Sequence, residues 1–277
     1  MNVKSTAGVQ TPDTPTVTTP GGKAAGAPRG RDLKASLLVG LLLIIAMEVA
    51  SRFVPDYIMP SPLIVANSLI ELMKTDATHI IVTLGRLLIA IIFSMAVGVT
   101  IGLIMGVSDR FGHYFRALVI IDTGIPALSW MLVAVFWFKE PETRIFFILT
   151  VILLPFYALN VYEGMKAIPR DWVDMMESFR PSRWQMMRFL IIPHIVPYIF
   201  LTTKSVVGYA IRMVIFAELV ASAVGIGSRM SLAQSMFRID QVLAWTFLLV
   251  VLNLVVQWLA VVAERHLLKW RTDVKVR

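Results

Sequence analysis

The chain of 277 residues is 57% hydrophobic and only 16% charged, whereas soluble domains carry about a quarter charged residues. It has no cysteine, which excludes disulfides, thiolate metal sites and cysteine nucleophiles. The net charge of +8 requires no nucleic-acid partner, because basic cytoplasmic loops give a membrane protein the same excess.

The first segment, residues 1–28, is rich in Thr, Pro, Gly and Ala and cannot build an apolar core. It also lacks the charged start, apolar stretch and cleavage site of a secretory signal. We expect it to be a disordered cytoplasmic tail. At the other end, residues 266–277 are expected to form a basic cytoplasmic tail.

Six hydrophobic stretches predict an all-α integral membrane protein, since a bilayer core needs about 20 apolar residues in a helix. They run about Ala35–Val54, Ile80–Val107, Ala117–Phe138, Ile145–Tyr162, Leu190–Ala223 and Leu243–Ala263. The second, fourth and sixth contain charge-free windows long enough to span alone: Leu87–Val107, Ile145–Tyr162 and Leu243–Ala263. The other three carry charges that something other than lipid must face.

The distribution of basic residues predicts the orientation. Fifteen Lys and Arg residues lie in segments on the same side of the membrane as the two termini, and six lie in segments on the opposite side. Because cytoplasmic loops carry the excess of Lys and Arg, both termini are expected in the cytoplasm.

A short amphipathic helix is predicted at residues 61–74, between the first two stretches. Ser61 suits an N-cap and Pro62 the first helical turn. One face is apolar: Leu63, Ala66, Ile70 and Met73. We interpret it as a helix at the outer membrane interface; a soluble scaffold helix is the alternative.

The loop of residues 163–188 is long, charged and patterned as a helix. Pro169 can begin a helix, and an apolar stripe follows at helical spacing: Trp172, Met175, Met176 and Phe179. Arg180-Pro181 should end this helix, and Ser182 to Gln185 has the spacing of a capping box. Such a helix suits a groove on a partner protein, although it could also lie on the membrane or on its own bundle.

The segment Pro169–Pro197 resembles the coupling loop of permeases from binding-protein-dependent ABC importers, in the subfamily for nitrate, sulfonates and taurine. That family has a Glu-Ala-Ala triplet, a later Gly and a Leu-Pro pair. Here Asp174, Met175 and Met176 stand at the triplet, Arg180 at the glycine and Ile192-Pro193 at the Leu-Pro pair.

Further segments carry the resemblance across nearly everything after residue 35. They are Met59-Pro60-Ser61-Pro62, Thr83-Leu84-Gly85-Arg86, the glycines 98, 102 and 106, Pro126 with Trp137-Phe138, Arg183-Trp184, Glu218-Leu219, Gly225-Ile226-Gly227 and Glu264 to Arg271. The resemblance implies a type I importer fold whose core, residues 80–265, holds five of the six spans.

What the resemblance implies is a permease subunit of the bacterial inner membrane that hydrolyses nothing itself. Two ATP-binding cassette subunits would hold ATP and Mg, a second copy would complete the pathway, and a periplasmic or lipid-anchored binding protein would deliver solute. The residues implied in ATPase coupling are Pro169, Trp172, Asp174, Met175, Met176, Phe179, Arg180 and Pro193. The sequence itself shows no phosphate-binding loop and no metal-ligand spacing, so no bound cofactor or metal is expected.

Five residues are candidates for the solute pathway: Asp122, Ser129, Trp130, Arg212 and Glu218. Arg212 could attract an anion, or could instead pair with Asp122 or Glu48 of neighbouring spans. Ser129 and Trp130 follow a kink expected at Pro126, and either touch solute or simply pack.

The predicted solute is a small anion, either nitrate, a sulfonate, taurine or an aromatic carboxylate. Pyrimidine vitamin precursors and riboflavin are alternatives among relatives. From other classes, an ion-coupled secondary transporter would need inverted repeats, and an intramembrane enzyme would need paired catalytic groups; neither is evident.

Overall fold

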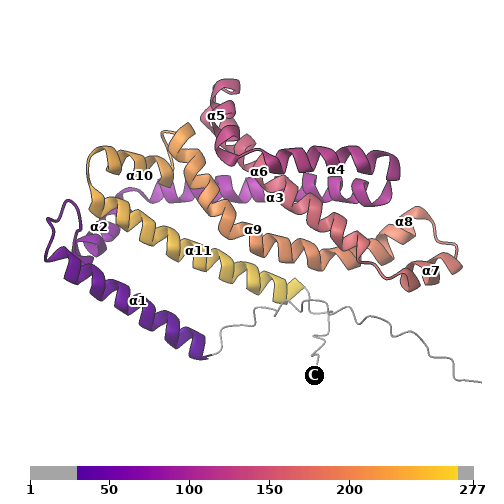
Figure 1. The fold of residues 1–277 in the computed structure, drawn as a ribbon, viewed down its shortest axis with the longest axis horizontal. Coiled ribbons are helices and arrows are strands. Elements are labelled where there is room, and N and C mark those ends of the chain that lie inside the picture. The colour runs from indigo at the N-terminus through magenta and orange to yellow at the C-terminus, as the bar shows by residue number, and fades with distance from the viewer. Residues whose placement is uncertain (1–29, 268–277) are drawn as a thin grey trace, which may run out of the picture. The chain divides into compact units, whose positions relative to one another are not determined.

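In the computed structural model of this chain, residues 30–267 are described, and every regular element among them is helical (Figure 1). The tail predicted at residues 1–28 and nearly all of residues 266–277 lie outside the described part. The elements are α1 (Gly30–Ser51), α2 (Pro62–Thr75), α3 (Ala77–Val107), α4 (Asp109–Gly124), α5 (Ala127–Trp137), α6 (Pro141–Lys166), α7 (Arg170–Ser178), α8 (Arg183–Met186), the π-helical η1 (Met187–Ile191), α9 (Ile192–Ala221), α10 (Ile226–Ser235) and α11 (Ile239–Leu267).

The chain divides into two compact units, Met1–Ala46 and Met47–Arg277. The first unit contributes the beginning of α1 to the described residues. The second holds α2 to α11, and all of the packing and sites below belong to it.

Helix α6 is the centre of the second unit and contacts α3, α4, α5 and α9. Its residues Ile145, Leu149, Leu153, Tyr157 and Val161 are completely buried. They recur at intervals of four residues, so one face of α6 is buried along its length.

Four helices are long and apolar enough to cross a membrane: Ala77–Val107, Pro141–Lys166, Arg183–Ala221 and Ile239–Glu264. The third of these runs through α8, η1 and α9 as one helix with a π-helical turn. These four confirm the second, fourth, fifth and sixth predicted spans. The described apolar part of α1, Leu38–Ser51, is shorter than a span, so the predicted count of six stays a prediction.

The predicted span Ala117–Phe138 is broken rather than continuous. Helices α4 and α5 meet at an angle of 97°, and together they would make a fifth span. Ile125 and Pro126 at the break have extended backbone, with ψ angles of 124° and 137°. Proline disfavours helical backbone at the residue before it and has no N–H to continue the helix, so the expected kink becomes a full break.

Helix α2 begins as predicted, with Ser61 as its N-cap accepting a hydrogen bond from the Ile64 amide at 3.4 Å. Its Ser68 and Leu72 are buried, and α2 packs on α11. The Ser68 hydroxyl donates to Asp240 at 2.7 Å. The predicted apolar face points away from this contact, with Leu63, Ile70 and Met73 more than half exposed. It is free to meet lipid or a partner.

Three glycines, at positions 98, 102 and 106, let α3 approach α6 closely. A Cβ at Gly98 would lie 2.9 Å from the Leu154 carbonyl oxygen, and one at Gly102 would lie 2.7 Å from that of Ala158. Both distances are shorter than a carbon can tolerate against backbone. Small residues at such crossings are what allow membrane helices to pack by van der Waals contact.

We expect Gly102→Ala to destabilise the protein by about 1–3 kcal/mol, because α3 and α6 must separate to accept the methyl group. Gly85→Ala is the matched control, since no atom lies within 4 Å of its Cβ position. The control should be neutral or stabilising by up to about 1 kcal/mol. Thermal unfolding of the detergent-solubilised protein measures both; equal midpoints for the two variants would contradict this packing.

Candidate functional site

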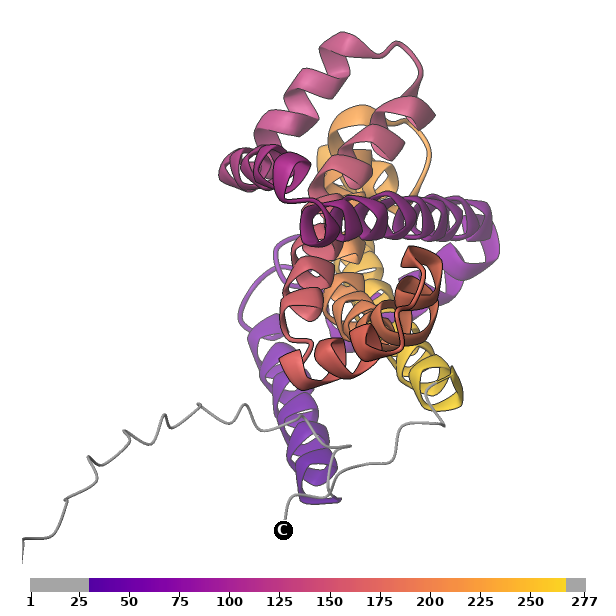
Figure 2. The ribbon, with the colours of Figure 1, turned by 90° about the vertical axis from the view of Figure 1, so that its right-hand side faces the viewer.

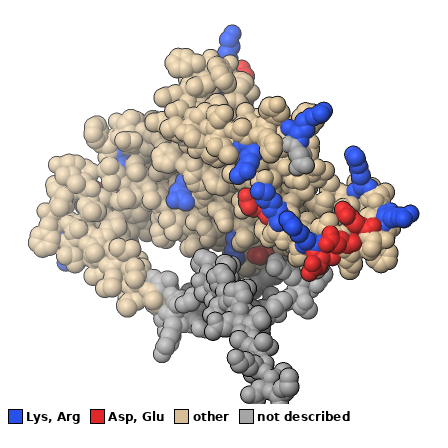
Figure 3. All heavy atoms as spheres, turned by 45° about the vertical axis from the view of Figure 1, so that its right-hand side comes forward, with Lys and Arg blue, Asp and Glu red and all other residues tan. Residues whose placement is uncertain are grey.

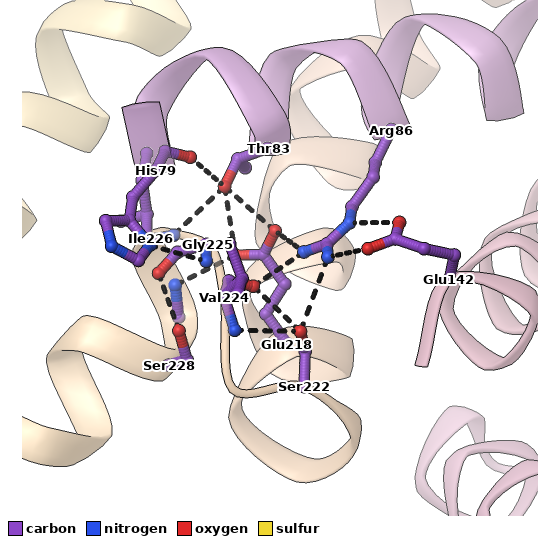
Figure 4. Close-up of polar contacts among 11 residues, drawn as sticks. His79, Thr83, Arg86, Glu142, Glu218, Ser222, Val224, Gly225, Ile226 and Ser228 are labelled. Carbon is purple, nitrogen blue, oxygen red and sulfur yellow. Dashed lines mark hydrogen bonds and ion pairs between the residues drawn. The ribbon is translucent and has the colours of Figure 1, made fainter. Parts of the chain in front are cut away.

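A buried polar network joins α3, α6, α9 and the loop that follows α9 (Figure 4). The Arg86 guanidinium donates from Nη1 to Glu218 at 2.8 Å and from Nε to Glu142 at 2.8 Å. Its Nη2 also pairs with Glu142. Because Glu218 has no exposed surface and Arg86 is 9% exposed, the central pair is removed from both lipid and water.

The remaining acceptor capacity of Glu218 is filled by nearby donors. The Thr83 hydroxyl donates to it at 2.8 Å, and the Gly227 amide at 2.9 Å. The Thr83 hydroxyl oxygen in turn accepts from the Ile226 amide at 3.0 Å. A buried carboxylate is stable only when paired and hydrogen-bonded in this way.

The same network fixes the loop after α9. Arg86 Nη1 donates to the Val224 carbonyl at 2.7 Å, and the Gly225 amide donates to Nδ1 of His79 at 3.0 Å. Gly225 has φ +121°, and a Cβ there would overlap the Glu218 carboxyl group. The Gly225-Ile226-Gly227 motif therefore lets the Gly227 amide reach the buried Glu218 carboxylate.

The end of the second unit opposite this network carries the predicted coupling loop. Viewed from that end (Figure 2), α7 and α8 lie in front of the long helices. None of the residues of α7 is buried. Figure 3 shows charged side chains of both signs gathered over α7, which contains Arg170, Asp171, Asp174 and Glu177.

The predicted end of α7 is confirmed. The helix stops at Ser178 and Arg180 follows with φ +48°, the left-handed conformation that suits the glycine of the family pattern. Ser182 then caps α8 in a capping box with Gln185, as the spacing predicted. The arginine makes the same turn as a glycine, at a conformational cost of about 1–2 kcal/mol.

The structure brings four of the predicted coupling residues together and leaves four apart. Trp172, Met175 and Met176 of α7 line a groove of about 550 Å³ with Pro193 of α9. Trp172 lies edge-on to His194 at a ring distance of 5.9 Å. Pro169 is the N-cap of α7, whereas Asp174, Phe179 and Arg180 are exposed outside the groove.

The five predicted pathway residues are also divided. Asp122 and Trp130 line one cavity of about 110 Å³ at the α4–α5 break, together with Tyr209 of α9. Ser129 is exposed and does not line it. Glu218 belongs instead to the buried network, so in this structure it faces no open path.

Arg212 is exposed on α9, and its Nε donates to the carbonyl of Gly208 one turn earlier at 3.1 Å. Among the described residues no ion pair joins it to Asp122 or Glu48, so the pairing alternative is wrong for these residues. Glu48 pairs with Arg52 at 3.0 Å.

Sequence reasoning did not single out Thr83, Arg86 and Glu142 as members of one site. A signal was present, because a carboxylate within a span needs a partner and Arg86 directly precedes the charge-free window of its span. Nothing in the sequence could choose Arg86 over Lys204, which lies closer in sequence and pairs with Glu264 at 3.7 Å.

Residues 98–269, more than half of the chain, match the family described as the binding-protein-dependent transport system inner membrane component. The chain belongs to this family. It is a multi-pass inner-membrane permease, a transport subunit and not an enzyme, and family membership implies an ATPase and a binding protein as partners.

Two curated permeases show the similarity along nearly the whole chain. The taurine transport system permease protein TauC of Escherichia coli is 24% identical over 90% of this chain and 94% of that protein. The putative aliphatic sulfonates transport permease protein SsuC of Bacillus subtilis is 24% identical over 92% of this chain and 91% of that protein.

Solved structures show the fold. An amino acid ABC transporter crystallised with histidines superposes with a TM-score of 0.63 over 72% of this chain and 97% of that one, at 16% identity. An inward-facing structure of the MetNI methionine ABC transporter superposes with a TM-score of 0.61 over 70% of this chain and 95% of that one, also at 16% identity. The permease therefore has the all-α fold of type I ABC importers, as predicted.

We expect Glu218→Gln to destabilise the permease by about 3 kcal/mol, because it leaves Arg86 without its fully buried counter-charge. Glu140→Gln is the control: Glu140 is exposed and its side chain caps nothing, so the change should stay within about 0.5 kcal/mol. Thermal unfolding in detergent measures both. Similar midpoints for the two variants would show that the network does not stabilise the fold.

For Arg180→Gly we expect a gain of about 1 kcal/mol, since glycine adopts the left-handed conformation without a Cβ clash. Arg180→Ala removes the same charge but keeps the Cβ, so it should give no gain. Unfolding midpoints of the two variants separate backbone strain from charge. A glycine variant less stable than the alanine variant would contradict the assignment of strain to this turn.

Proposed function

We propose that this permease supplies half of the pathway of an ATP-driven importer for a small organic or inorganic anion. Two copies pair about a two-fold axis, because one chain encloses only one side of a path. Both termini and α7 lie in the cytoplasm, and each copy presents α7 to one of two ATPase subunits. Those subunits hold ATP and Mg, and a periplasmic or lipid-anchored binding protein delivers the solute.

The observation that carries the proposal is the continuity of the helix from Arg183 to Ala221. Its first residues follow α7 directly, and Glu218 in its last turn belongs to the buried network. A displacement of α7 by a partner therefore acts on a single rod that reaches the opposite end of the permease. The groove shared by α7 and α9 adds side-chain contact to this covalent link.

The anionic nature of the solute is supported by Arg212 and by the relatives. An arginine exposed within a span needs a polar surrounding, and guanidinium matches the oxygens of sulfonate, carboxylate or nitrate. TauC and SsuC are named for taurine and aliphatic sulfonates. A face of α9 that carries an exposed arginine suits the wall of an anion pathway better than a lipid contact.

Reconstitution with the ATPase subunits in proteoliposomes tests the importer directly. We expect labelled 2-aminoethanesulfonate, presented with a binding protein, to accumulate only with ATP and to stop with vanadate. Ionophores that dissipate proton and sodium gradients should leave uptake unchanged. Uptake that follows an ion gradient and needs no ATP would instead establish secondary transport.

We expect reversal of two of the exposed acidic residues of α7, Asp174→Lys with Glu177→Lys, to abolish ATPase co-purification and to lower ATP-dependent uptake at least about tenfold. Asp56→Lys with Glu71→Lys is the matched control, since both residues are exposed and lie outside α7. Gel filtration checks that each variant is folded. If the α7 variant retained its ATPase as well as the control does, docking through this helix would be refuted.

A further inference from the structure

The cavity at the α4–α5 break contains an acidic group without a basic partner. Asp122 lines it, and among the described residues no Lys, Arg or His forms an ion pair with this carboxylate. A charged side chain within a span costs about 2.5–3.5 kcal/mol unless a polar or opposite charge faces it. The cavity therefore lacks a cation.

Backbone groups of both polarities border the cavity. Helix α4 ends at Gly124, beside the lining residues Asp122 and Thr123, and a helix C-terminus carries partial negative charge on its last carbonyls. Pro155, inside α6, also lines the cavity and has no N–H to donate to the carbonyl of Val151. These two features add hydrogen-bond acceptors, whereas Ala127, the first residue of α5, brings the amide donors of a helix N-terminus to the same cavity.

Aromatic rings complete the wall. Trp130, Phe156 and Tyr209 line the cavity, and the last two rings lie 5.4 Å apart. Ring faces attract ammonium groups, particularly where water is excluded. The buried indole N–H of Trp130 lies beside Asp122 and interacts with its carboxylate.

An acid-binding group lies on the neighbouring surface. Arg212 follows the cavity residue Tyr209 by three positions on α9, so the two share one face of that helix. The cavity of about 110 Å³ has room for about three or four waters, which fits an amino group with a short chain and not a fused ring system.

We propose that this cavity binds the ammonium group of a small zwitterionic solute, with the solute's acid group directed toward Arg212. The inference rests on the proposed function and narrows its solute from anions in general to amino acids or amino sulfonates. Asp122 and the aromatic rings select the amino end, and simple anions such as nitrate lack the group that this cavity recognises.

The test uses the complete complex of permease and ATPase in lipid nanodiscs and matched pairs of solutes that differ only in the amino group. The pairs are 2-aminoethanesulfonate with 2-hydroxyethanesulfonate, and 3-aminopropanoate with 3-hydroxypropanoate. Equilibrium binding to the wild-type complex should favour the amino member of at least one pair by about tenfold. In Asp122→Asn that preference should fall to within about twofold, through weaker binding of the amino compound alone.

Two further variants keep the test decisive. Asp122→Glu retains the charge and should retain the preference, and Asp56→Asn removes an exposed acid elsewhere and should change nothing. An amino preference that survives Asp122→Asn overturns the proposal, as does the absence of binding by both amino compounds at about 10 mM. ATP-dependent uptake is measured separately. If uptake did not depend on ATP but the preference for amino compounds remained, the proposal of an ATP-driven importer would be refuted and the proposal of an ammonium site in the cavity would stand.

Discussion

The buried pair of Arg86 and Glu218 is the interaction on which the rest of the structure depends. It lies where α3, α6 and α9 meet the loop after α9, and it is satisfied by a second carboxylate, a hydroxyl, a backbone amide and a backbone carbonyl. An isolated charge in an apolar medium is too costly to persist, so these elements are held in one arrangement. The long helix from Arg183 is thereby anchored at one end and follows α7 at the other.

This arrangement separates two kinds of charge within the spans. Glu218 is saturated with partners and stabilises the bundle, whereas Asp122 and Arg212 form no ion pair among the described residues. Charges that the fold has not neutralised are the ones available to a solute. Asp122 lies at the α4–α5 break, and Arg212 lies on the exposed face of α9. Under the proposed function, a pathway between two copies would run past both residues.

Much of the fold could be predicted from the sequence because membrane spans and helix ends are local properties. Charge-free apolar windows of at least 18 residues predicted α3, α6 and α11, and the capping box at Ser182 predicted the start of α8. The full break at Pro126 could not be predicted, because a proline within a span gives a kink or a break according to its neighbours. The partner of Glu218 could not be chosen either, since a pair 132 residues apart in sequence depends on the packing of three helices.

The absence of cysteine makes the central claim, that α7 is the docking point of the ATPase, directly measurable. A single cysteine is introduced by Asp174→Cys on α7 and, as the reference, by Glu71→Cys on α2. The rate of maleimide labelling is then compared between the permease alone and its complex with the ATPase. The account predicts strong protection at position 174 and none at position 71; equal labelling of position 174 in the two states would contradict it.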